Sequence, residues 1–133
     1  MTDGEGEAGD RRARGREAER IAEAFLSRAG FEILDRNHAT RRGEVDLVCR
    51  EGSVVCFVEV RSRTSTAQGG PEETVGRGKA RRVVAAATDW ALRNGGLEQE
   101  MRFDVVAVTF EEAGPRVALY RGAFDGEGKP GLW

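Results

Sequence analysis

Residues 43–64 alternate between hydrophobic and polar positions and are interrupted once by a short stretch containing glycine. Successive side chains of a β-strand point to opposite faces, so this pattern predicts two strands joined by a tight turn. One face of the pair is apolar, and the other carries four charged side chains. The apolar face is formed by Val45, Leu47, Val54, Cys56, Val58 and Val60, and the charged residues are Glu44, Asp46, Glu59 and Arg61.

The turn between these strands decides which charged residues lie opposite one another. A two-residue hairpin loop can be formed either by residues 51–52 or by residues 52–53. The first choice places Asp46 opposite Phe57, and the second places it opposite Glu59. Opposed Cβ atoms lie roughly 4.5–5.5 Å apart and diagonal ones roughly 7–8 Å apart, so the two carboxylates can share one small ligand in either register.

Apolar residues elsewhere in the chain predict two helices and three further strands. A helix follows the third strand, which makes the third and fourth strands parallel through a right-handed crossover, while the first three form an antiparallel meander. The expected fold class is therefore α/β, with a mixed sheet flanked by helices. We expect helices at 12–29 and from 72 or 73 (or from Gly78) to 93, and strands at 31–39, 101–110 and 116–122.

A chain of 133 residues is long enough for one domain with a real core and too short for two. The acidic, glycine-rich residues 1–10 predict a disordered tail, residues 11–122 the α/β domain, and residues 123–133 a C-terminal tail in which Trp133 could pack back. Residues 64–73 are polar and contain glycine, which predicts a flexible loop.

Charge and cysteine content narrow the classes of function. A formal net charge of −2 argues against a protein that coats nucleic acid by bulk charge, although arginines and a lysine cluster at 11–20 and at 77–82. The two cysteines lie inside apolar runs and form neither a disulfide framework nor a zinc pattern, which indicates a reducing compartment. No signal peptide or transmembrane run is apparent, so we expect a cytoplasmic protein without a membrane partner.

The charged face of the hairpin has two interpretations. Buried carboxylates persist where a cation or hydrogen-bond donors compensate them, and Asp46 and Glu59 are hard oxygen ligands suited to Mg²⁺ or Mn²⁺. Such a metal lowers the pKa of a bound water and polarises a phosphoryl oxygen. Alternatively, the charges form surface ion pairs without function, worth roughly 0–1 kcal/mol each. In that case Glu59 pairs with Arg61, while Glu44 and Asp46 pair with Arg41, Arg42 or Arg63.

Three stretches carry a resemblance to a known family: "GREAERIAEAFLSRAGFEILDRNHATRRGEVDLVCREGSVVCFVEVRSRT", "KARRVVAAATDWAL" and "RFDVVAV". Together they run from about Gly15 to Val108 and resemble the YraN family, an uncharacterised bacterial group regarded as endonuclease-like. That family is similar to the PD-(D/E)XK nuclease superfamily, which includes archaeal Holliday-junction resolvases. The resemblance implies a single-domain restriction-endonuclease-like fold with an αβββαβ core and a Mg²⁺ or Mn²⁺ site.

The resemblance also implies roles for individual residues. Glu19 corresponds to the helix glutamate, Asp46 to the strand aspartate and Glu59 to the acid of the final motif, and all three would be metal ligands. Arg61 stands where the superfamily has lysine; it would stabilise charge on phosphate but is less suited to activating water. Lys79 matches a lysine that recurs in the family and could supply a compact cation. Predicted contacts to phosphate are Lys79, Arg81, Arg16 and Arg63.

Two functional hypotheses follow. The first is a metal-dependent endonuclease acting on nucleic acid, with DNA favoured and branched or repair intermediates as candidate substrates; its catalytic residues would be Glu19, Asp46, Glu59 and Arg61. The second is a non-catalytic module on a nuclease fold, which binds nucleic acid or protein and in which "EVR" marks a decayed site. Both hypotheses leave homodimerisation open.

Overall fold

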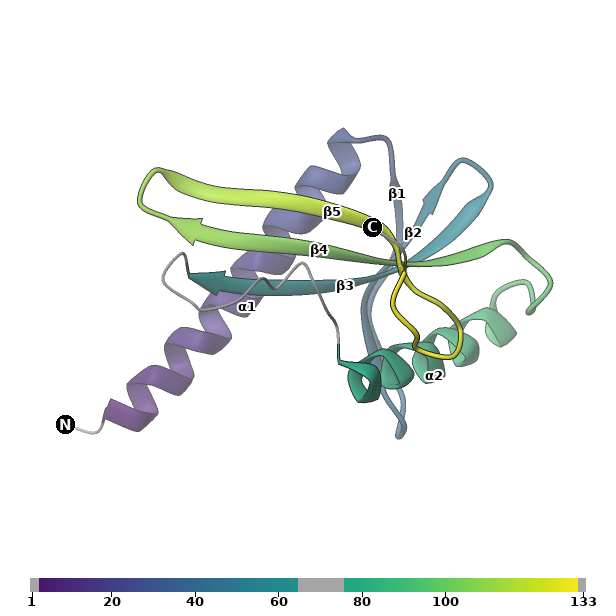
Figure 1. Cartoon of the computed structure of the whole chain (residues 1–133), viewed down its shortest axis with the longest axis horizontal. Coiled ribbons are helices and arrows are strands. Elements are labelled where there is room, and N and C mark those ends of the chain that lie inside the picture. Colours follow the sequence, from purple (N-terminus) through teal and green to yellow (C-terminus); the bar gives the residue numbers. More distant parts are fainter. Residues whose placement is uncertain (1–2, 65–75, 132–133) are drawn as a thin grey trace.

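The computed structural model describes residues 3–64 and 76–131, with side chains described from residue 12 onward. Two helices and five strands follow one another along the chain in the order α1, β1, β2, β3, α2, β4, β5 (Figure 1). Their bounds are α1 Asp3–Arg28, β1 Glu32–Ala39, β2 Glu44–Glu51, β3 Val54–Thr64, α2 Arg77–Arg93, β4 Met101–Glu111 and β5 Gly114–Phe124.

All five strands belong to one sheet, in the order β1-β2-β3-β4-β5. The pairs β1/β2, β2/β3 and β4/β5 are antiparallel, whereas β3 and β4 are parallel and are connected through α2. The structure thus confirms the predicted meander, the crossover helix and the α/β class. This architecture is compatible with a single-domain nuclease-like fold.

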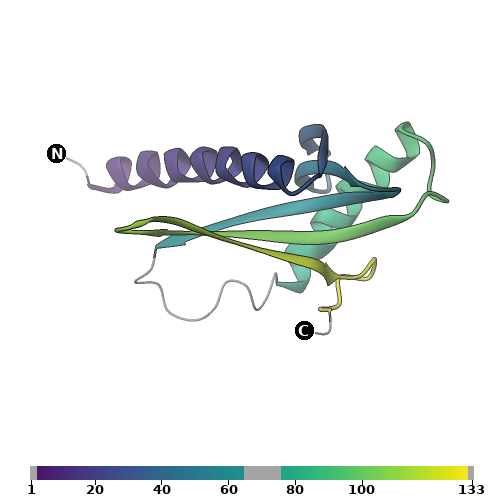
Figure 2. The same cartoon turned by 90° about the horizontal axis from the view of Figure 1, so that it is seen from above.

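The sheet is covered on both faces, because each strand buries apolar side chains on each side. The long helix α1 lies along one face (Figure 2), where Ala18, Ala22 and Leu26 follow one another at four-residue spacing and pack on the strands. Helix α2 packs Val83, Ala87 and Trp90 against the other face. Two separate hydrophobic clusters result, one beneath each helix.

The hairpin between β2 and β3 adopts the second of the two predicted registers. Glu51 pairs with Val54, so Gly52 and Ser53 form the loop. Gly52 has φ +62°, a left-handed conformation that favours glycine. The described ladder continues from there to Leu47 and Val58, where β2 and β3 stop pairing.

Val45 does not lie where strict alternation placed it. The sequence predicts that Val45 shares a face with Leu47, but Val45 is fully buried in the α2-side cluster with Val48, whereas Leu47 belongs to the α1-side cluster. The reason is that β2 leaves β3 beyond Leu47 while it remains paired with β1, through His38 and Val45. A strand that loses one neighbour can twist, and its side chains then change face.

Two elements extend well beyond their predicted bounds. Helix α1 begins at Asp3 and not near Arg12, so much of the tail predicted to be disordered is helical; once the packed part of a helix has formed, each added residue contributes a backbone hydrogen bond without a new nucleation cost. Strand β5 extends to Phe124, which is buried and forms a bridge with Pro130, so the C-terminal tail is partly ordered. Trp133 and residues 65–73 of the predicted loop lie outside the described residues.

Candidate functional site

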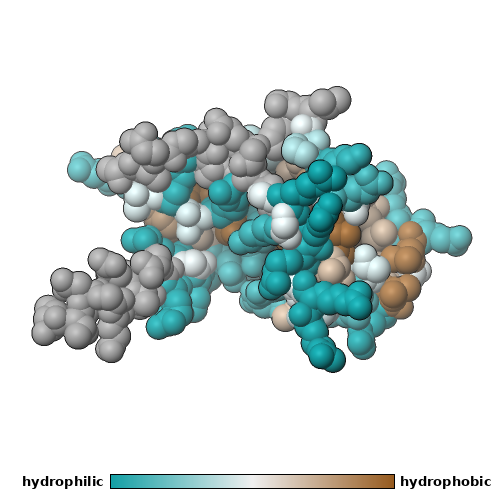
Figure 3. All heavy atoms as spheres, turned by 60° about the horizontal axis from the view of Figure 1, so that its bottom comes forward, coloured by the Kyte–Doolittle hydropathy of each residue, from teal (hydrophilic) through white to brown (hydrophobic). Residues whose placement is uncertain are grey.

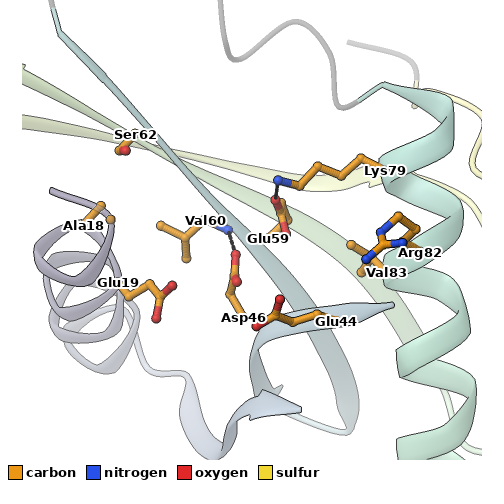
Figure 4. A pocket seen from close by; sticks show the side chains of 11 residues that line it. Ala18, Glu19, Glu44, Asp46, Glu59, Val60, Ser62, Lys79, Arg82 and Val83 are labelled. Atoms are coloured by element: carbon orange, nitrogen blue, oxygen red, sulfur yellow. Dashed lines mark hydrogen bonds and ion pairs between the residues drawn. The ribbon is translucent and has the colours of Figure 1, made fainter. Parts of the chain in front are cut away.

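A cavity of about 440 Å³ opens where β2 separates from β3 (Figure 4). Because the sheet is interrupted there, side chains from α1 on one face and α2 on the other reach the same space. Four of the predicted site residues, Glu19, Asp46, Glu59 and Lys79, line it. The lining residues are Gly15, Ala18, Glu19, Glu44, Asp46, Glu59, Val60, Ser62, Lys79, Arg82 and Val83.

Asp46 takes over part of the interrupted ladder. The backbone N–H of Val60 on β3 donates a 2.8 Å hydrogen bond to Oδ2 of Asp46 on β2. In a regular strand pair, a backbone carbonyl of β2 would accept this hydrogen bond. Figure 4 shows the carboxylate of Asp46 at the cavity, joined to Val60 by this hydrogen bond. Asp46 is therefore held in place by the strand that carries Glu59.

Glu59 is the most deeply buried acid of the cavity, with only 3% of its surface exposed. Its Oε2 lies 2.8 Å from Nζ of Lys79, which reaches down from the first turns of α2. Burial, and then the charge of Asp46, raise the pKa of Glu59 to about 8, while Lys79 opposes this shift. The hydrogen bond to Glu59 in turn raises the pKa of Lys79, which keeps its ammonium charged.

Glu19 approaches the same site from α1. Partial burial and then the charge of Asp46 raise its pKa, and a hydrogen bond with the side chain of Asn37 partly offsets both effects. Figure 4 shows the carboxylate of Glu19 directed into the cavity toward Asp46. Four carboxylates, those of Glu19, Glu44, Asp46 and Glu59, therefore line one cavity together with the compact ammonium of Lys79.

The donor set fits a hard divalent cation through two carboxylates. Among the described residues, no three histidine, cysteine, aspartate or glutamate side chains lie together closely enough to hold a metal ion. Mg²⁺, however, usually keeps several waters and is held by one or two carboxylates together with substrate phosphates. Asp46 and Glu59 satisfy this pattern, with Lys79 now occupying the cation position beside Glu59.

The remaining predicted site residues lie around the cavity and do not line it. Arg61 follows Glu59 on β3, is half-buried, and lies close enough for its charge to lower the pKa of Lys79. Arg63 is also half-buried on β3. Arg16 is exposed on α1 and borders a neighbouring groove, whereas Arg81 lies on α2 near Gly128.

The interpretation of Glu59 as a member of an exposed surface pair was wrong. Its carboxylate is buried and pairs with Lys79 from another element. Arg102 and Asp104, in contrast, form a structural pair: both oxygens of the fully buried Asp104 accept from Arg102, and Gly122 N–H donates to it as well. None of these three residues lines the cavity.

Arg82 had been noted from the sequence only as part of the basic cluster at 77–82, and Asn37 had not been singled out. Arg82 lines the cavity one helical turn after Lys79, and the three-residue spacing on a predicted helix was a signal that could have found it. Asn37 contacts Glu19 from β1 and has φ +51°, which is uncommon for a residue other than glycine. Its only sequence signal was a weak strand former inside a predicted strand.

The surface around α2 is mainly hydrophilic. Figure 3 shows hydrophilic side chains across most of this face, with a hydrophobic patch toward one end. Among the described residues, the exposed large hydrophobic side chains are Leu92 and Leu97, at the end of α2 and just after it. Neither described helix combines the length and apolarity that a membrane span requires.

The fold and the cavity together define a nuclease-like α/β domain with acidic residues at an interrupted sheet. The model of the uncharacterised protein family UPF0102 matches residues 18–108. The chain belongs to this family, which is the YraN nuclease-like family, and the resemblance found in the sequence is thereby confirmed.

Relatives of the same family cover nearly the whole chain. A UPF0102 protein of Anaeromyxobacter dehalogenans is 69% identical over 134 residues, covering 100% of both chains. One from Desulforapulum autotrophicum is 41% identical and covers 83% of this chain and 91% of its own. One from Chromohalobacter salexigens is 43% identical and covers 87% and 94%, respectively.

Proposed function

We propose that this protein is a metal-dependent phosphodiesterase of the endonuclease type that acts on nucleic acid, with DNA as the favoured substrate, in the cytoplasm. The observation that carries the proposal is the convergence of Glu19, Asp46 and Glu59 in one cavity with a lysine. Glu59 is buried, and the charge of Asp46 beside it raises its pKa further, an arrangement that costs free energy unless a cation compensates it.

The chemistry expected here is hydrolysis of a phosphodiester bond. A bound Mg²⁺ or Mn²⁺ would supply a water of lowered pKa and polarise the phosphoryl oxygen. Asp46 and Glu59 would hold the ion, and the N–H of Val60 keeps Asp46 oriented for this purpose. Glu19, with its raised pKa, is placed to accept a proton or a hydrogen bond at the edge of the cavity.

Lys79 is our candidate for the role that lysine has in the superfamily motif. Arg61 stands at the motif position but does not line the cavity, whereas the ammonium of Lys79 lies 2.8 Å from Glu59. A divalent ion that takes this place would release the ammonium toward the substrate phosphate. Lysine is a compact point charge suited to that contact. We therefore assign Lys79 to phosphate binding and Arg61 to electrostatic support.

The proposal is tested by calorimetric titration of Mn²⁺ into the wild-type protein and Asp46→Ala, followed by incubation of the same samples with branched and linear DNA. We expect saturable binding and cleavage in the wild type and loss of both in the variant. Lys79→Met should retain Mn²⁺ binding but cleave roughly 100-fold more slowly or worse, since it removes a charge aimed at the transition state.

Glu98→Gln serves as the control, because it removes an exposed carboxylate far from the cavity lining; it should bind and cleave like the wild type. Wild-type cleavage that persists in Asp46→Ala would disprove the assigned site. A wild type that is folded but neither binds Mn²⁺ nor cleaves either DNA would disprove the enzymatic function.

A non-catalytic binding module is the second candidate. The observation that favours it is the ion pair between Lys79 and Glu59, which neutralises one of the two proposed metal ligands. Binding through arginines would lose affinity steeply with salt and show no dependence on divalent metal. A salt-insensitive interaction would instead indicate a protein partner. Native mass measurement in either case tests whether the protein forms a homodimer.

A further inference from the structure

A second groove, of about 240 Å³, lies beside the acidic cavity between α1 and β1. Glu19 lines both hollows, so they meet at its side chain. The groove is richer in basic groups than the cavity. Its lining residues that matter here are Arg16 and Arg20 from α1 and Arg36 and Asn37 from β1.

The positive charge of this groove resides on Arg16 and Arg20. Arg36 donates two hydrogen bonds, of 2.8 and 2.6 Å, to the carboxylate of Glu23, so these two charges largely cancel. Arg16 and Arg20 are exposed and have no ion-pair partner within the part of the chain whose side chains the structure describes. They lie four residues apart on α1, so both point to the same side of the helix.

Asn37 adds a polar side chain to the groove, and its backbone conformation is unusual. Its φ is +51°, although its neighbours Arg36 and His38 both pair regularly with β2. Non-glycine residues in this conformation persist only where the surrounding structure imposes them, and they cluster at functional sites and ligand clamps. The left-handed turn places the amide of Asn37 at Glu19 and in the groove.

We propose that this groove binds a phosphate of the nucleic-acid strand next to the phosphate in the acidic cavity. Arg16 and Arg20 supply the charge, and the amide of Asn37 supplies a hydrogen-bond donor. The strand then crosses Glu19 and continues over α1. The inference rests on the proposed function, since it extends the same substrate beyond the scissile bond. It is nevertheless testable without cleavage.

The experiment measures binding of a fluorescein-labelled 30-base-pair DNA duplex in EDTA, by anisotropy over a series of salt concentrations. Each neutralised phosphate contributes about 0.9 to the steepness of log K against log salt for duplex DNA, so Arg16→Gln/Arg20→Gln, which removes the charge around one phosphate, should reduce the slope by about 1. Asn37→Gly should weaken binding at every salt concentration while leaving the slope unchanged, because it removes a neutral donor.

The matched control is Arg28→Gln, an identical substitution of an exposed arginine at the far end of the same helix. It should leave both slope and affinity at the wild-type level. Equal losses of DNA affinity in Arg28→Gln and Arg20→Gln would overturn the proposal, because they would indicate diffuse electrostatic attraction and not a specific groove. Unchanged binding in Arg16→Gln/Arg20→Gln, or a wild type that binds no DNA in EDTA, would also overturn it.

Failure of this inference and failure of the proposed function are distinguishable. Cleavage and Mn²⁺ binding depend on Asp46 and Glu59, whereas the binding assay in EDTA depends on Arg16 and Arg20. A protein that cleaves DNA but binds it independently of these two arginines would keep the proposed function and lose the groove.

Discussion

Single residues at the cavity and in the neighbouring groove are held in arrangements that are unfavourable on their own. Glu59 is buried beside another acid, and Asp46 accepts a strand N–H in place of a backbone carbonyl. Asn37 adopts a left-handed backbone inside a strand. Each arrangement costs free energy locally, so the rest of the fold must stabilise it.

At position 37, the glycine variant should be more stable than the alanine variant, the reverse of the usual order in a strand. The free energy of unfolding of Asn37→Gly should equal that of the wild type or exceed it by up to about 1 kcal/mol, since glycine adopts positive φ freely. Asn37→Ala should lose roughly 1 kcal/mol, because a Cβ without a compensating polar group is strained there. Chemical denaturation measures both.

The control for Asn37 is Glu32, an exposed position at the start of the same strand. Here the variant Glu32→Gly is expected to be less stable than Glu32→Ala, as at ordinary strand positions. If Asn37→Gly were also less stable than Asn37→Ala, the left-handed conformation would not govern this position.

At the scale of elements, the cavity depends on how closely α2 approaches the turn before β2. Gly43 is buried in this turn, and a Cβ on it would overlap the carbonyl oxygen of Arg82 on α2. Arg82 lines the cavity, and Glu44 follows Gly43 in the chain. The helix that carries Lys79 is thus positioned against the strand that carries Asp46 through a contact that only glycine allows.

Gly43→Ala should therefore destabilise the fold by roughly 1–3 kcal/mol, the usual cost of overpacking. It should also reduce Mn²⁺ binding, because α2 must move away from β2. Gly78→Ala is the control: its Cβ would meet open space inside α2, so stability should be unchanged or up to about 1 kcal/mol higher. Equal stability of both variants would argue against the close approach.

A network of ion pairs joins the other ends of β2, β4 and β5. Arg121 and Arg102 both contact Glu51, at 2.7 Å each. These contacts, that of Arg121 foremost, lower the pKa of Glu51 to about 2. The folded chain therefore keeps this carboxylate ionised at a pH where the unfolded chain protonates it.

The stabilisation from Glu51 is expected to be complete above about pH 4.5, its ordinary pKa, and lost as the pH falls toward 2. The free energy of unfolding of Glu51→Gln should lie below that of the wild type at pH 6, and the two should converge as the pH approaches 2. Glu112→Gln, in the exposed β4–β5 turn, should show no such convergence. A gap that stayed constant with pH would contradict the assignment.

At the scale of the whole molecule, the two helices on opposite faces meet at one site because the sheet is interrupted between them. Glu19 is carried by α1 and Lys79 by α2, and each helix is held by its own hydrophobic cluster. The position of Glu19 depends on the packing of Ala18, Ala22 and Leu26. Alanines at two of these positions let α1 approach the sheet closely.

Leu26→Ala should lower the free energy of unfolding by roughly 2–5 kcal/mol, because the side chain is fully buried under α1. Leu92→Ala is the matched control on α2, where leucine is 63% exposed, and should change stability by no more than about 0.5 kcal/mol. Thermal and chemical denaturation compare the two. Similar losses in both variants would contradict the core described beneath α1.

The sequence by itself determined the features that depend on local periodicity. The alternation at 43–64 predicted the hairpin, and helical spacing predicted both helices. The crossover rule predicted that β3 and β4 are parallel. These predictions succeeded because strand and helix periods are properties of neighbouring residues and chain handedness limits the connections.

Only the tertiary structure decided how residues far apart in the chain meet. The separation of β2 from β3 moved Val45 to the α2 side and opened the cavity. The docking of α2 placed Lys79 on Glu59, and the left-handed turn brought Asn37 to Glu19. No periodic pattern encodes these contacts, because they follow from where packed elements and unpaired strand ends come together in space.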